Sequence, residues 1–210
     1  MFVIIRIYLL NQKIKIMSVN LLETIQKNLG YAELQKIDPN TQQETFDETK
    51  PAQHTFIQAA IPAVLTGLYR YAQTDAGAAE ILRVANSDIW MTKIFETNKK
   101  AVVQAVSDYS KQPVADAELQ MNAIANEAIK VAKENLADNA DIKEVKTFFS
   151  DQKNNILLYL PPALNMGTLL HDETMDDNTN KMEGPVSSLI KNIGAAFTNP
   201  VTAEDINQNK

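Results

Sequence analysis

Apolar and polar residues alternate along most of this chain with the three-to-four-residue period of amphipathic helices. The clearest stripe starts after Phe56, where apolar positions 57, 61, 64, 65, 68 and 71 fall on one helical face with Pro62 embedded among them. Similar stripes run from Trp90 to Tyr109 and from Met121 to Leu136. No run alternates with the period of two that a strand requires. The pattern predicts an all-α, multihelical fold.

Helix ends are marked by capping residues. Asn20 with Glu23, and Asp141 with Glu144, have the spacing of a capping box, in which two side chains satisfy the free backbone N–H groups of the first turn. We expect Gly77 to begin a short helix. A longer helix is expected to follow, capped at residues 87–88 and continuing to Pro113. A short turn is expected at residues 32–37.

One segment occurs twice, 100 residues apart. Pro62-Ala63-Val64-Leu65-Thr66-Gly67-Leu68 recurs as Pro162-Ala163-Leu164-Asn165-Met166-Gly167-Thr168-Leu169. A proline inside a helix bends it, and a glycine lets another backbone approach closely. The repeat predicts a bundle of two pseudo-repeated halves whose proline-containing helices cross at the centre. The alternative is that the pattern is only scaffold.

The repeat and the loops suggest four segments. Residues 1–16 are interpreted as a non-native extension, with Met17 as the true initiator. Residues 17–86 form the first helical half, residues 87–197 the second, and residues 198–210 a disordered polar tail. The apolar run at the N-terminus is too short to cross a bilayer.

The first half also carries a resemblance. The run FIQAAIPAVLTGLYRYAQTDAGAAEIL, preceded by NLLETIQKNLG, resembles the YidB-like bacterial family of helical proteins. The similarity covers residues 18–85, and faintly residues 152–193, whereas residues 88–150 have no counterpart. It implies a multihelical fold in a bacterial protein of uncharacterised function, and it carries over no catalytic residue.

Composition narrows the functional classes. The chain has no cysteine, which excludes disulfides and thiolate metal sites, and we expect a cytoplasmic protein. Its net charge of −6 disfavours nucleic acid and anionic membrane surfaces, both of which attract basic proteins.

One acidic loop has the spacing of a calcium site. Within residues 172–183, oxygen-bearing side chains fall at the positions that an EF-hand loop uses, but Asp177 stands where the sharp turn needs glycine. An ordinary solvated loop is the alternative. The candidate ligands are Asp172, Thr174, Asp176, Asn180 and Glu183.

Other chemistry is sparse. His54 and His171 flank the two proline segments and could form a metal pair, although lone histidines more often cap helices or face water. No nucleophile elbow or phosphate-binding glycine loop is present, so we assign no catalytic residue and expect a protein that is not an enzyme.

Three functions remain open. The first is a module for self-association or for binding an unknown protein partner. The second is a carrier of small molecules or lipids, with a cavity between the proline helices that residues 156–170, including Met166, would line. The third is a calcium-binding module that uses residues 172–183.

Overall fold

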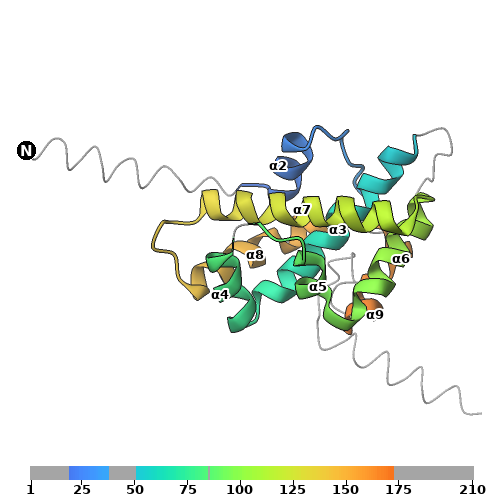
Figure 1. Cartoon of the computed structure of the whole chain (residues 1–210). Helices are drawn as coiled ribbons and strands as arrows, with labels where there is room; N and C mark the ends of the chain where they lie inside the picture. The colour runs from blue at the N-terminus through green and yellow to red at the C-terminus, as the bar shows by residue number, and fades with distance from the viewer. Residues whose placement is uncertain (1–18, 38–50, 85, 173–210) are drawn as a thin grey trace, which may run out of the picture. The chain divides into compact units, whose positions relative to one another are not determined.

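The computed structural model describes residues 19–37, 51–84 and 86–172, and these residues are helical with no strand (Figure 1). The all-α prediction is confirmed for them. Short 3-10 turns, η1 (Glu96–Asn98) and η2 (Pro162–Leu164), join some of the helices. The α-helices are α2 (Leu21–Asn28), α3 (Ala52–Ala72), α4 (Asp75–Arg83), α5 (Trp90–Phe95), α6 (Lys99–Ser110), α7 (Val114–Asn135), α8 (Ile142–Leu157) and α9 (Met166–Leu170).

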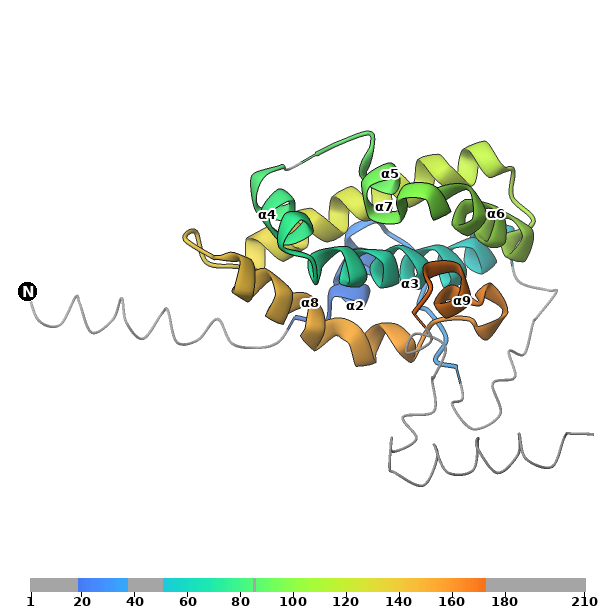
Figure 2. The same cartoon turned by 90° about the horizontal axis from the view of Figure 1, so that it is seen from below.

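Helix α3 lies at the centre of these helices (Figure 2). Every residue from Phe56 to Leu68 is buried, so other helices must pack around the whole circumference of α3. The helices packed against it are α2, α4, α5, α6, α7, α8 and α9. The described parts of residues 17–86 and 87–197 therefore share one hydrophobic core.

Gly67 allows a close approach, but by side chains rather than by the backbone that its position in the repeat predicts. A Cβ atom there would lie 2.4 Å from the Phe95 ring and 2.6 Å from Ile94 Cγ2. The neighbour that approaches is α5, whereas the sequence suggested the second proline segment.

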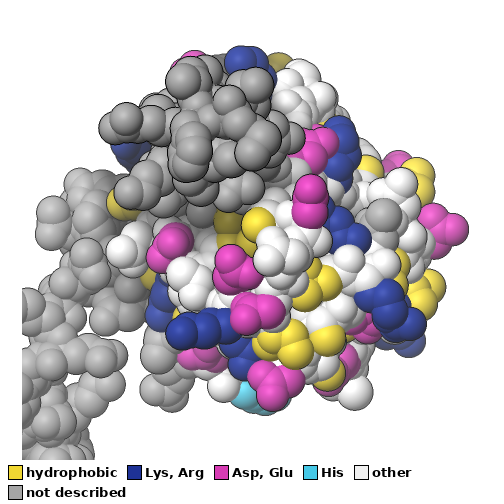
Figure 3. All heavy atoms as spheres, turned by 90° about the vertical axis from the view of Figure 1, so that its left-hand side faces the viewer, with side chains coloured by type: hydrophobic (Ala, Val, Ile, Leu, Met, Phe, Trp, Pro, Cys, Tyr) yellow, Lys and Arg dark blue, Asp and Glu magenta, His cyan; other side chains and the backbone are white. Residues whose placement is uncertain are grey.

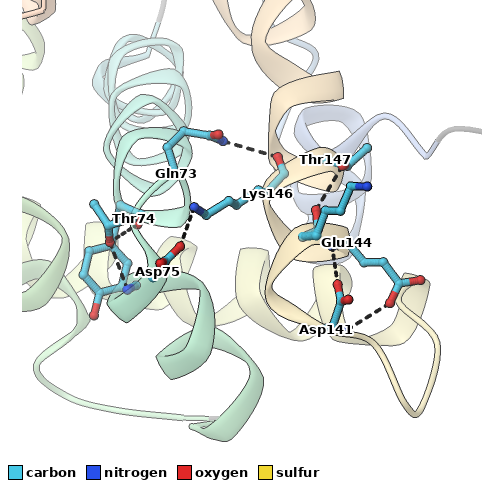
Figure 4. Close-up of polar contacts among 10 residues, drawn as sticks. Gln73, Thr74, Asp75, Asp141, Glu144, Lys146 and Thr147 are labelled. Atoms are coloured by element: carbon cyan, nitrogen blue, oxygen red, sulfur yellow. Dashed lines mark hydrogen bonds and ion pairs between the residues drawn. The ribbon is translucent and has the colours of Figure 1, made fainter.

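Two of the expected caps are present, at Asn20 and at Asp141. The cap expected at residues 87–88 is not, because α5 begins at Trp90 after Ile89 and has no side-chain cap. Asp141 and Glu144 form both bonds of a capping box, each 2.9 Å long (Figure 4). The Asn20 side chain accepts a bond from the Glu23 N–H at 3.3 Å, and no reciprocal bond accompanies it. Both helices begin where the sequence places them.

Helix α4 begins two residues before Gly77, because Thr74 caps it by accepting the Gly77 N–H at 2.9 Å. Glycine is required there, since a Cβ atom would lie 2.0 Å from the Tyr71 carbonyl oxygen. The same corner is tied to α8: Lys146 Nζ lies 2.7 Å from Asp75 Oδ1 (Figure 4).

The helix expected to run on to Pro113 is broken, which corrects the prediction. Glu96 has a positive φ of 48° and separates α5 from α6. Thr97 and Asn98, which follow it, are weak helix formers. Because of this break, α5 and α6 can each pack an apolar face against α3.

The second proline helix is also absent. Helix α8 ends at Leu157, and Pro162 lies in the 3-10 turn η2 rather than inside a continuous helix. Two adjacent prolines explain this, because Pro161 precedes Pro162 and a residue before proline disfavours the α conformation. Asn165 then turns the chain in the left-handed region at φ 47°. The two copies of the repeated segment therefore differ in conformation.

Residues 31–37 form no helical turn, contrary to expectation. Their backbone instead bonds to distant groups. Buried Gln58 accepts the Gln35 N–H at 2.8 Å, and its amide donates to the carbonyls of Gln35 and Tyr159 at 3.0 Å each. The Ile37 N–H donates to the Leu158 carbonyl at 2.8 Å. Gln58 thus joins the segment before α3 to the segment after α8.

Among the described residues, no helix combines the length and the apolar character needed to cross a bilayer.

Candidate interaction surface

Helix α7 carries the most exposed large apolar side chain of the described residues. One side of α7 is buried in the core through residues such as Met121, Ile124 and Ala128. Leu119 lies on the opposite side and is 73% exposed. Ala115 and Ala123 precede and follow it by one turn, are also exposed, and share its face.

The chain between α4 and α5 is held against this face by two asparagines. The Asn126 side chain accepts the Ser87 N–H at 2.9 Å and donates to the Ser87 carbonyl at 3.2 Å. Asn122 donates to the same carbonyl at 3.1 Å and accepts the Met91 N–H at 3.3 Å. Ile89 lies between these two anchored residues and is 53% exposed, so its side chain adds apolar surface beside α7.

A shallow hollow of about 520 Å³ opens to solvent beside Ala123. Its walls come from the α4–α5 connection and from the C-terminal half of α7. The lining residues are Asn86, Ser87, Asp88, Ala123, Asn126, Glu127 and Lys130. We call the hollow, together with Ile89, Ala115, Asp116 and Leu119, the α7 surface.

The amide of Asn126 has its hydrogen bonds made inside the protein. Its oxygen accepts from Ser87, and its nitrogen donates to the carbonyls of Ser87 and Asn122. Covering this side chain with an apolar group therefore breaks no bond to the amide, and the large cost of an unmade hydrogen bond does not arise.

Opposite charges lie at the two ends of the α7 surface. Asp116 is exposed near the start of α7. Lys130, near its end, pairs with Glu127 at 3.3 Å, but the lysine side chain is 55% exposed and the glutamate only 13%. Glu127 also accepts a bond from Asn28 at 2.8 Å. The glutamate is thus held against α2, and the lysine is the charge that projects.

The end of the molecule where α7 leads into α8 has a mixed character. Acidic, basic and apolar side chains are interspersed over the described part of this face (Figure 3).

A polar cluster distinct from the α7 surface joins α3, α4 and α5. Glu80 accepts the Tyr71 hydroxyl at 2.8 Å and pairs with Lys93 at 2.5 Å and Arg83 at 3.3 Å. The bonds from Lys93 and Tyr71 lower the pKa of the Glu80 carboxyl. Burial, and then the bond to Glu80, raise the pKa of Tyr71. Trp90 packs edge-on to Tyr71 with ring centres 6.5 Å apart. Because these side chains form hydrogen bonds and ion pairs with one another, the cluster holds the three helices together.

The calcium prediction falls mostly outside the described residues. Asp172 is the last described residue, and its N–H donates to the Gly167 carbonyl at 2.8 Å. The other four candidate ligands, Thr174, Asp176, Asn180 and Glu183, lie outside the described ranges.

The two histidines occupy helix ends. His54 lies in the first turn of α3, and His171 follows α9 with a positive φ of 55°. Within the described ranges, no three His, Asp or Glu side chains gather as metal ligands would. Met166, the proposed cavity-lining residue, is packed in the core, and the hollow lies against α7 instead.

Sequence reasoning did not find the α7 surface. The stripe through Met121 and Ile124 identified the buried side of α7, but Leu119 falls off that stripe. An apolar residue on the polar side of an amphipathic helix was the available signal. The asparagine contacts with Ser87 join residues distant in sequence and left no local pattern.

Comparison with known proteins gave no relative: no family model, no curated protein and no solved structure matches this chain. The likeness of residues 18–85 to the YidB-like family stays an expectation from the sequence.

Proposed function

We propose that this protein is a self-association module that acts through contact between copies of the chain rather than through catalysis. The observation that carries the proposal is the exposure of Leu119, at 73%, on the side of α7 that faces away from the core. A single exposed leucine is common on protein surfaces. Here it lies with exposed Ile89, Ala115 and Ala123, and grouped apolar side chains of this kind make up the centre of an interface. The adjoining hollow, lined mainly by polar side chains, is of the kind found at an interface rim.

The exposed leucine would supply part of the energy of such an interface. Burying one leucine side chain contributes about 1.5–3 kcal/mol, and a symmetric contact buries two. Asn126 needs no new bond on being covered, because its amide is already bonded to Ser87 and Asn122. At this amide, the apolar gain is therefore not offset by a lost hydrogen bond.

Replacing Leu119 tests the proposal. We expect sedimentation analysis to show that the wild type is dimeric and that Leu119→Glu is monomeric, with an unchanged helical circular dichroism spectrum. The matched control is Val114→Glu. Val114 is 41% exposed on the same helix, but at about 100° per residue it points about 140° away from Leu119. This control should remain dimeric. A wild type that stays monomeric over the accessible concentration range, or a dimeric Leu119→Glu variant, would contradict the proposal.

A further inference from the structure

We infer that two copies pair through antiparallel α7 helices, with the two-fold axis between Leu119 and Ala123, so that each Leu119 enters the hollow of the other copy. The inference rests on the proposed function and adds the geometry and the specificity of the contact.

The α7 surface carries a projection and a hollow side by side. Leu119 projects, whereas the hollow starts one turn further along at Ala123 and extends to Lys130. In a two-fold contact, if residue i meets residue j of the other copy, then j also meets i. An antiparallel pair with its axis between Leu119 and Ala123 places the Leu119 side chain of each copy in the hollow of the other copy. A parallel pair would set Leu119 against Leu119 and leave each hollow unfilled.

Charge favours the same orientation. Asp116 and Lys130 are exposed at opposite ends of the surface. Antiparallel pairing brings Lys130 of each copy near Asp116 of the other, whereas parallel pairing sets like charges together. The helix dipoles also oppose one another only when the helices are antiparallel.

Small side chains permit a close contact. Ala115 and Ala123 flank Leu119 on the exposed face, and helices with small residues at the contact approach to about 8 Å. Ile89 is held near Asn122 by the anchored residues on either side of it. Because Asn122 lies within a turn of the proposed axis, the two Ile89 side chains fall near each other and enlarge the apolar centre.

Engineered cysteines test the orientation, because the chain has none of its own. Ala115→Cys, Ala123→Cys and Lys130→Cys are oxidised separately as full-length proteins. Ala123→Cys should form a disulfide dimer, since this position adjoins the axis. At 1.5 Å of rise per residue, the two copies of position 115 are about 18 Å apart along the helices, and those of position 130 about 27 Å. Both separations exceed the roughly 7 Å between Cα atoms that a disulfide spans. These two variants should therefore form a disulfide only when mixed with each other.

A charge exchange tests the specificity. Asp116→Lys and Lys130→Asp should each weaken the dimer about tenfold, because either change affects two symmetry-related pairs. The double variant, with both charges exchanged, should regain the wild-type dissociation constant. Double-variant dimers as weak as those of the single variants would overturn the inference.

The outcomes separate the inference from the proposed function. A monomeric wild type removes both. A dimer that Leu119→Glu dissociates, but in which all three cysteine variants cross-link with themselves, keeps the proposed function and shows that the helices pair in parallel. A dimer that cross-links only at Ala123, and in the mixture of the other two variants, supports the antiparallel pair.

Discussion

Gly67 determines how closely α5 can approach the central helix. Replacing it with alanine would bring a Cβ atom to 2.4 Å from the Phe95 ring, so the ring and Ile94 must move. Such overpacking costs about 1–3 kcal/mol, and the higher helix propensity of alanine offsets up to about 1 kcal/mol of this. We expect Gly67→Ala to lower the free energy of unfolding, as measured by urea denaturation at neutral pH.

The smaller side chain of leucine should relieve the clash at Phe95. The cost of Gly67→Ala should therefore be smaller in a Phe95→Leu background than in the wild type. Equal costs in the two backgrounds would show that the ring is not the group that limits the contact.

The sequence pattern predicted the structural role of some of these residues and not of others. Gly67 was expected to allow a close approach because its place in the repeat follows a helical proline. Leu119 was missed because its exposure depends on which side of α7 the other helices cover, and that is settled by tertiary packing. The anchoring of Ser87 by Asn122 and Asn126 was missed for the same reason.

Glu80 links three helices, and its charge should make their packing depend on pH. Its pKa is held below the ordinary value of 4.5 by Lys93 and Tyr71, so the unfolded chain binds a proton more readily than the folded one. The stabilising contribution is thus complete above about pH 4.5 and is lost as the pH falls through the lower, folded pKa. We expect Glu80→Gln to cost about 1 kcal/mol at neutral pH, and the difference from wild type to shrink in acid. Urea denaturation at a series of pH values measures both.

Asp75 provides the control for this prediction. Its pKa is also lowered, by a bond to Lys146, but its side chain is 83% exposed, and solvent screens such a pair. Asp75→Asn should therefore change stability less than Glu80→Gln does. An effect of Glu80→Gln that stays constant with pH would show that the carboxylate charge is not the cause.

Elements were predictable where the signal was local. The capping box of Asp141 and Glu144 lies within four residues and was read correctly. The break at Glu96 was not, because the apolar stripe continues across it and only packing on α3 favours two helices over one. Pro161 was a local signal for the end of α8, and the likeness of the two repeated segments obscured it.

The shared core has a consequence for the whole molecule. Because α3 is buried on all sides by helices from both halves, residues 17–86 alone would expose most of its apolar surface. We expect a fragment of residues 17–86 to lack a cooperative thermal transition by circular dichroism, whereas the full chain unfolds in one. A cooperative transition in the fragment would mean that the first half is an independent domain.

Gln58 has a consequence for how the chain selects one arrangement among many. The helices around α3 bury their apolar residues in one core, and hydrophobic burial by itself is not directional. The Gln58 amide is satisfied only when Gln35 and Tyr159, from opposite ends of the described chain, both reach it. An assembly that lacks either segment leaves a buried amide bond unmade, at about 1–3 kcal/mol. The Gln58 side chain therefore destabilises near-native misfolded states that hydrophobic burial alone would not distinguish from the native state.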